Sequence, residues 1–233
     1  MPDDDTASMR LHPGEPEATG WRVTPLAAIV DRLRAASPGV GGRPRVVAID
    51  GRGGSGKTTL ADRLVAAVPD SAVVHTDDIA WHHAYFDWGG QLADHVLKPL
   101  HRGAPVDHRP AAWIDRRRPG SIIVPAGLDF VWVEGTGVLR DELSPWLDAS
   151  IYLQGDLDDQ DRLLLARDGD SPEQRAHVAG WLREELPFLL RERPWARATV
   201  VAAGPARMPY DPYTELVVAS APGRQADGAT RGG

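Results

Sequence analysis

The chain has 233 residues, and its 26 Lys and Arg against 33 Asp and Glu give a formal net charge of −7. This length suits one ordinary domain with its own core, and the acidic balance argues against a protein that coats DNA or RNA. The lack of cysteine excludes disulfides, cysteine-ligated zinc, iron–sulfur clusters and thiol catalysis. There is no long apolar stretch and no signal-like start, so we expect a cytoplasmic protein that binds neither nucleic acid nor membrane.

The two ends of the chain differ in composition from the middle. Residues 1–20 are rich in proline, glycine and acids without an apolar period, so we expect a disordered N-terminal segment. Apolar residues at helical spacing predict a helix over 21–36. We expect the folded domain to span 21–220 and the glycine-rich residues 221–233 to form a flexible tail.

Strands and helices alternate along the rest of the chain. The predicted strands, which are short apolar runs, cover 45–50, 72–75, 130–134, 150–153, 199–202 and 216–219. The further predicted helices cover 57–65, 91–102, 157–167 and 172–191. An irregular stretch rich in proline and arginine follows the helix at 91–102. This alternation predicts an α/β fold in which helices cover both faces of a parallel sheet.

A glycine-rich turn joins the strand at 45–50 to the helix at 57–65. Residues 51–58 fit the pattern G-x-x-x-x-G-K-[ST] at every fixed position. Glycines let backbone N–H groups wrap phosphate oxygens, and the helix that follows directs its positive end at the anion. Lys57 would place a mobile charge on the outer phosphates, and the Thr58 hydroxyl can ligate Mg²⁺. The nucleotide-binding candidates are Gly51, Gly53, Gly54, Ser55, Gly56, Lys57, Thr58 and Thr59.

Acidic residues follow two of the predicted strands. Asp77 and Asp78 follow the strand at 72–75, and Glu134 ends the strand at 130–134. Ligand groups lie at the carboxyl ends of such strands. An acid there can accept a proton from an alcohol that attacks the γ-phosphate, or hold water on Mg²⁺. We take Asp77 as the first candidate, with helix capping as the alternative role for one of the pair. The metal candidates are Thr58, Asp77 and Glu134.

These motifs resemble the uridine kinase-like family of P-loop kinases, which also includes nicotinamide riboside and pantothenate kinases. The resemblance covers most of residues 44–203. It implies a P-loop NTPase-type three-layer sandwich with a mostly parallel five-stranded sheet and a small helical lid. It also implies that Asp77 is the general base and that Glu134 assists magnesium. From the chemistry of the loop itself, we expect Lys57 to stabilise the transferring phosphoryl group.

The segment Asp161-Arg162-Leu163, followed by Ala166-Arg167-Asp168, resembles the lid of the same family. The resemblance implies that Arg162 and Arg167 clamp the phosphates, and guanidinium forks suit a charge spread over three oxygens. A helix places the two arginines on neighbouring but different faces, so only one of them need reach the nucleotide. The alternative is a solvated helix with Asp–Arg pairs.

An insert rich in aromatic residues and histidine lies between Asp77 and Glu134. Aromatic faces stack on rings, and an Asp beside them can hold sugar hydroxyls. The segment Tyr85-Phe86-Asp87 is similar to the family's segment whose Asp binds ribose. The substrate-binding candidates are Asp87, Trp81, His83, Trp88 and Trp113, and core packing is the alternative for the tryptophans.

The sequence therefore predicts an enzyme that uses ATP and Mg²⁺. We expect a kinase that transfers the γ-phosphate to a hydroxyl of a nucleoside-like small molecule. Kinases for a vitamin, sugar or antibiotic remain alternatives, as does a nucleotide-hydrolysing switch or binding protein, and a homo-oligomer is left open. A GTPase is disfavoured because Leu97-Lys98-Pro99, around the one lysine besides Lys57, is not a guanine-reading Asn-Lys-x-Asp element.

Overall fold

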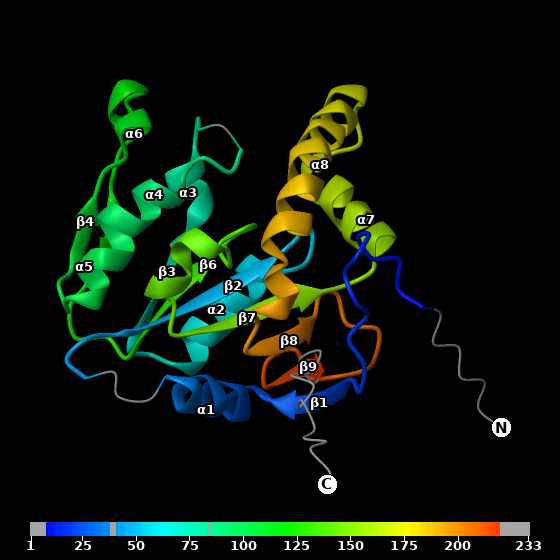
Figure 1. The fold of residues 1–233 in the computed structure, drawn as a ribbon, viewed down its shortest axis with the longest axis horizontal. Helices are drawn as coiled ribbons and strands as arrows, with labels where there is room; N and C mark the ends of the chain where they lie inside the picture. Colours follow the sequence, from blue (N-terminus) through cyan, green and yellow to red (C-terminus); the bar gives the residue numbers. More distant parts are fainter. Residues whose placement is uncertain (1–7, 38–40, 84, 220–233) are drawn as a thin grey trace, which may run out of the picture.

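The central feature of the structure is a seven-stranded sheet (Figure 1). The computed structural model describes residues 8–37, 41–83 and 85–219. The strands of this sheet are β1 (Arg22–Pro25), β2 (Arg45–Gly51), β3 (Ser71–His75), β6 (Phe130–Glu134), β7 (Ala149–Gln154), β8 (Val200–Ala203) and β9 (Glu215–Ala219). Their order is β1-β9-β8-β7-β2-β6-β3. The five strands from β8 to β3 pair in parallel, and β9 is antiparallel to both of its neighbours.

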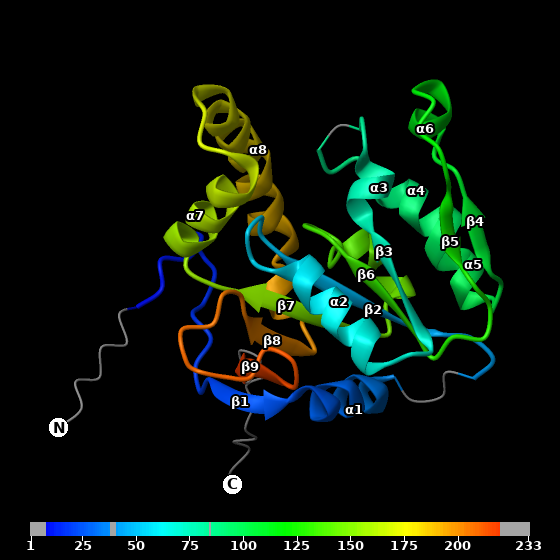
Figure 2. The same ribbon diagram turned by 180° about the vertical axis from the view of Figure 1, so that it is seen from behind.

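Helices cover both faces of the sheet, as Figures 1 and 2 show from opposite sides. The helices are α1 (Leu26–Ala36), α2 (Lys57–Ala67), α3 (Thr76–Ala80), α4 (Gly89–Leu92), α5 (Lys98–His101), α6 (Ala111–Asp115), α7 (Leu157–Asp168) and α8 (Pro172–Glu192). Three shorter pieces are the π-helix η1 (Ala93–Leu97) and the 3₁₀ helices η2 (Asp141–Trp146) and η3 (Pro194–Ala196). No helix in the described ranges is both long and apolar enough to cross a membrane.

The two faces of β2 belong to two different hydrophobic cores. Val47 and Ile49 pack with α1 and α2 on one face, and Val46 and Ala48 pack with α3, α4 and α5 on the other. Side chains alternate between the faces of a strand, so a strand buried on both faces must be apolar throughout. This is why the continuous apolar run at 45–50 predicted its place at the centre of the sheet.

The predicted fold class is confirmed, and the sheet is larger than expected. All six predicted strands are present, and the five-stranded parallel part is extended by β9 and β1. The single helix predicted over 21–36 is wrong for its first residues, because residues 22–25 form β1 and the helix begins at Leu26. Thr24 precedes a proline, which disfavours the helical conformation, and β9 supplies a free edge with which this segment pairs.

The stretch expected to be irregular also contains structure. The helix predicted over 91–102 spans α4, η1 and α5 without a break. Strands β4 (Val106–His108) and β5 (Ile122–Val124) then form a separate antiparallel pair that carries α6 at its tip. Figure 1 shows this hairpin and the α7–α8 pair as two projections on opposite sides of the molecule, with α3 between them.

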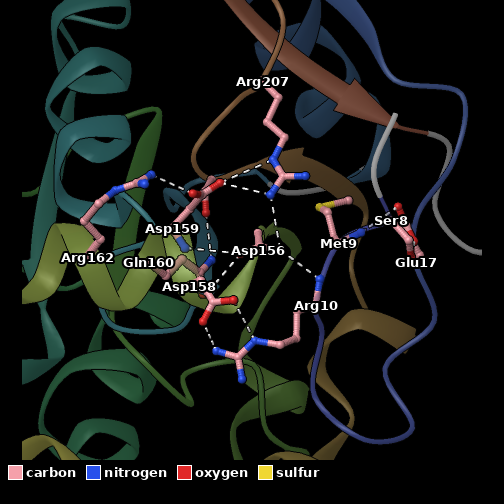
Figure 3. Close-up of polar contacts among 11 residues, drawn as sticks. Ser8, Met9, Arg10, Glu17, Asp156, Asp158, Asp159, Gln160, Arg162 and Arg207 are labelled. Carbon is pink, nitrogen blue, oxygen red and sulfur yellow. Dashed lines mark hydrogen bonds and ion pairs between the residues drawn. The ribbon is translucent and has the colours of Figure 1, made fainter. Parts of the chain in front are cut away.

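Residues 8–20, expected to be disordered, are instead packed against β7 and the start of α7. Ala18 and His12 are buried, and the Ala18 N–H donates to Gln154 at 2.7 Å. Arg10 lies beside Asp156, the residue that caps α7, and its backbone N–H donates to that carboxylate at 2.8 Å (Figure 3). The sequence did not reveal these contacts, because most of them are hydrogen bonds, which need no apolar period. Residues 1–7 and the predicted tail at 221–233 lie outside the described residues.

Candidate functional site

The glycine-rich turn forms a tight loop between β2 and α2. Gly54 and Gly56 have φ angles of +76° and +87°, a region that favours glycine. A Cβ atom on Gly54 would overlap the backbone carbonyl of Gln160 in α7, so only glycine fits there. The loop is therefore held against α7 by close backbone contact.

Several polar groups of this loop have no partner among the described residues. The backbone N–H groups of Gly54, Gly56 and Lys57 take part in none of the hydrogen bonds formed within the described part of the chain. The Ser55 hydroxyl is buried and also lacks a partner there. The three N–H groups are thus free to bind a ligand. Together with the positive end of α2, they fit an anion with several oxygens.

Lys57 points back into the loop. Its Nζ donates to the backbone carbonyl of Arg52 at 2.8 Å. Burial lowers the pKa of Lys57, although the carboxylates of Glu134, Asp50, Glu185 and Asp77 act in the opposite direction. The flexible stem of a lysine lets the ammonium turn from this carbonyl to a bound anion.

Glu134 lies at the end of β6, where the sheet brings it next to β3. The register pairs Glu134 with His75, and His75 Nδ1 lies 2.6 Å from Glu134 Oε1. The hydrogen bond to Glu134 raises the pKa of His75. The Thr58 hydroxyl donates to the same carboxylate at 3.4 Å. Hydroxyl and carboxylate oxygens from Thr58 and Glu134 thus meet beside the loop, and this oxygen-rich set fits Mg²⁺.

Asp77 stands in the first turn of α3, directly after β3. Burial and the nearby Glu134 carboxylate raise the pKa of Asp77, while Lys57 opposes this shift. Its neighbour Asp78 turns away and pairs with Arg118 at 2.5 Å. The two adjacent acids are thereby separated into one that faces the loop side and one that holds the β4–β5 hairpin.

A cavity of about 530 Å³ brings these groups together. The lining residues are Gly53, Gly54, Gly56, Lys57, Thr58, Thr59, Asp77, Glu134, Gly135, Thr136, Leu163, Leu164, Arg167, Asp168, Gln174, His177, Val178 and Trp181. The loop, the two predicted acids and the α7–α8 pair therefore share one space. Of the predicted nucleotide-binding residues, all but Gly51 and Ser55 line the cavity.

The two predicted lid arginines lie in different places on α7. Arg167 lines the cavity and pairs with Asp168 at 2.6 Å. That hydrogen bond raises the pKa of Arg167. Arg162 lies outside the lining and is directed toward Asp159, to which it donates at 2.6 Å (Figure 3). The structure thus brings Arg167 to the site and leaves Arg162 on the solvated face of the helix.

None of the predicted substrate-binding residues lines the cavity. Trp88 and Trp113 are buried in the hydrophobic core, and the Trp113 indole donates to the Asp78 carbonyl at 3.0 Å. Trp81 packs against the same core. His83 Nε2 lies 3.0 Å from Gln91 Nε2, and Asp87 is exposed. The expectation for Trp88 and Trp113 is corrected because the segment from α3 to β5 must cover one face of the sheet, and its aromatic side chains supply that cover.

Residues of α8, rather than those of the aromatic insert between Asp77 and Glu134, line the cavity. Gln174, His177, Val178 and Trp181 line the cavity, together with Leu163 and Leu164 of α7. The centroid of the Trp181 ring lies 5.4 Å from the ring centroid of Tyr85 and 5.3 Å from that of Phe86. The sequence singled out no residue of this helix, because its apolar spacing indicated only packing and its distance from the loop along the chain gave no hint of contact.

Comparison with solved structures shows where the fold has been seen before. The structure of a possible uridine kinase from Bacillus stearothermophilus matches with a TM-score of 0.50 and 21% identity, covering 75% of this chain and 98% of that one. A proposed fructose transport system kinase from Silicibacter sp. TM1040 matches with a TM-score of 0.47 and 19% identity, covering 74% and 91%. No protein-family model and no curated protein matches the sequence. The first likeness shows that this chain shares the α/β fold of the Bacillus stearothermophilus protein.

Proposed function

We propose that this protein is an ATP-dependent kinase of the uridine kinase-like group, which transfers the γ-phosphate to a hydroxyl of a nucleoside-like small molecule. The observation that carries the proposal is the shared cavity, in which the phosphate loop faces Asp77 and Glu134 across the end of the sheet. The fold shared with a possible uridine kinase is consistent with it.

The loop residues suit the triphosphate of ATP. The free N–H groups of Gly54, Gly56 and Lys57 would bind phosphate oxygens. Thr58 and Glu134, with Asp77 close by, would hold Mg²⁺, which neutralises charge on the phosphates when bound. Arg167 is the side chain of α7 placed to stabilise the transferring group.

Asp77 suits the role of general base. Its raised pKa makes the carboxylate a better proton acceptor than an ordinary Asp. In the transfer, the acceptor oxygen bonds to the γ-phosphorus while the bond to the bridging oxygen of ADP breaks, and the hydroxyl proton passes to Asp77.

The acceptor would bind against α8. Trp181 offers an aromatic face, Val178 and Leu163 offer apolar surface, and His177 and Gln174 offer hydrogen-bonding groups. A ring that carries both apolar faces and polar edges matches this wall, as a nucleoside-like alcohol does.

The test is ATP consumption by the full chain with Mg²⁺ and a panel of nucleosides, sugars and other alcohols. We expect turnover that depends on one class of acceptor, and Asp77→Asn should lower turnover by roughly 10²-fold or more while ATP still binds. Asp78→Asn is the matched control, since Asp78 faces Arg118. ATP hydrolysis without any acceptor dependence would instead support the nucleotide-hydrolysing switch, and full turnover in the Asp77→Asn variant would remove Asp77 from the mechanism.

A further inference from the structure

Arg52, at the first unspecified position of the G-x-x-x-x-G-K-[ST] pattern, has a buried side chain that joins the loop to both helices of the α7–α8 pair. The residue is 5% exposed. Its guanidinium donates to Gln160 at 3.3 Å and to Asp161 at 3.2 Å, both in α7. Its Nε lies 3.5 Å from a carboxylate oxygen of Glu185 in α8. Only the planar fork of an arginine reaches three such partners at once.

Glu185 continues this connection to the cavity wall. The residue is 1% exposed, and the side chain of Trp181, four residues earlier on the same face of α8, opposes the rise in the pKa of Glu185 that burial causes. Trp181 lines the cavity. At the other end, the Arg52 carbonyl accepts the hydrogen bond from Lys57. A series of neighbouring residues, Lys57–Arg52–Glu185–Trp181, thus links the phosphate side of the cavity to its α8 side.

A buried Arg–Glu pair is a poor way to gain stability. Removing two charges from water costs free energy that their attraction often fails to recover, and apolar residues of similar size commonly stabilise a fold as well or better. The pair at Arg52 and Glu185 is therefore better explained by the orientation it imposes than by the stability it contributes.

We propose that Arg52 and Glu185 are positioning residues that couple anion binding at the phosphate loop to the orientation of Trp181. An anion in the loop attracts the Lys57 ammonium away from the Arg52 carbonyl, and the change at Arg52 passes through Glu185 to the indole. The proposal rests on the proposed function for what the two sides bind, namely a triphosphate and an acceptor ring. Through this coupling, the side of the cavity that α8 forms responds to the presence of the phosphoryl donor.

The test follows Trp181 without requiring the acceptor. The full chain is labelled with 5-fluorotryptophan, and its eight tryptophans are resolved by ¹⁹F NMR, with Trp181 assigned from Trp181→Phe. Inorganic tripolyphosphate with Mg²⁺ is titrated, and calorimetry measures its binding. We expect the Trp181 resonance to shift with the same Kd as the calorimetric binding.

Two variants separate coupling from direct contact between the anion and Trp181. Glu185→Gln keeps the size of the side chain but removes its charge, and we expect tripolyphosphate still to bind while the Trp181 shift is lost. Glu184→Gln, at the exposed neighbour, is the matched control and should keep the shift. A double variant, Arg52→Met with Glu185→Leu, replaces both buried charges by apolar groups and is expected to fold, to bind tripolyphosphate and to lose the shift.

The possible outcomes are distinct. A shift that persists in Glu185→Gln and in the double variant overturns the coupling and leaves the proposed function intact. An unaltered protein that binds no tripolyphosphate overturns the proposed function, and the coupling with it.

Discussion

His12 is a histidine buried away from the cavity, in the segment that packs against β7. It is 6% exposed, and its Nε2 has no hydrogen-bond partner among the described residues. Burial, together with the positive charges of Arg52 and Arg10, lowers the pKa of His12 from 6.5 to about 4. The folded protein therefore holds this imidazole neutral at pH values where the unfolded chain would protonate it.

The burial of His12 should make the protein less stable as the pH falls from 7 to 5. Because the pKa of His12 is lower in the folded state, this imidazole binds more protons in the unfolded state, and its contribution to the free energy of unfolding falls by about 2 kcal/mol between pH 7 and pH 5. Urea unfolding at pH 7 and pH 5 measures this loss. In His12→Asn the loss should be smaller by that amount, whereas His82→Asn, at an exposed histidine, should behave like the unaltered protein. Equal pH dependence in His12→Asn and the unaltered chain would contradict the burial argument.

At the scale of elements, α7 separates two arginines that the sequence treated alike. Arg167 lines the cavity and Arg162 is held by Asp159 outside it. Arg167→Met should therefore lower kcat/KM for the proposed transfer by roughly 10²-fold, as the loss of a charged donor at a transition state does. Arg162→Met removes an exposed ion pair and should leave kcat/KM within about threefold. Steady-state kinetics of both variants decides the matter, and equal losses would mean that α7 moves as a whole during turnover.

The elements also show what the sequence could reveal. The strands and the glycine-rich loop at 51–58 were predictable because a strand buried on both faces must be apolar and because such a loop needs glycine at fixed positions. Strand β1 was not, since four residues next to a helix gain their conformation from pairing with β9 at the other end of the chain. The sequence left Trp88 and Trp113 between a binding site and the core, because aromatic residues serve both equally well, and the packing places them in the core.

The residues of α8 that line the cavity could not be identified from the sequence, for a related reason. His177 and Trp181 line the cavity only because the tertiary fold places α8 beside it. Trp181 also contacts Tyr85 and Phe86, which lie nearly a hundred residues earlier in the chain. Local patterns carry no information about such pairings. Asp77 and Glu134 could be identified from the sequence, because the carboxyl ends of parallel strands lie at one edge of the sheet regardless of the loops that join the strands.

At the scale of the whole molecule, the segment at 8–20 belongs to the folded unit. It crosses the ends of β7 and α7, where the Glu15 carboxylate accepts hydrogen bonds from Tyr152 at 3.1 Å and from Gln154 at 2.7 Å. The Arg10 carbonyl accepts from the N–H of Leu157 at 2.9 Å. Without the segment, the buried side chains of Tyr152 and Gln154 would lose these partners.

Deletion of residues 1–20 should therefore destabilise the domain that the sequence placed at 21–220. Each lost hydrogen bond to a buried group costs about 1–3 kcal/mol, and 1 kcal/mol moves the melting temperature of a protein this size by about 2–4 °C. We expect a melting temperature lower by roughly 5–15 °C in differential scanning calorimetry. Arg10→Met is the control, because it removes only exposed contacts to Asp158 and should cost less than about 1 kcal/mol. A truncated protein that melts with the full chain would show that the segment adds no stability, and that β7 and α7 satisfy their polar groups without it.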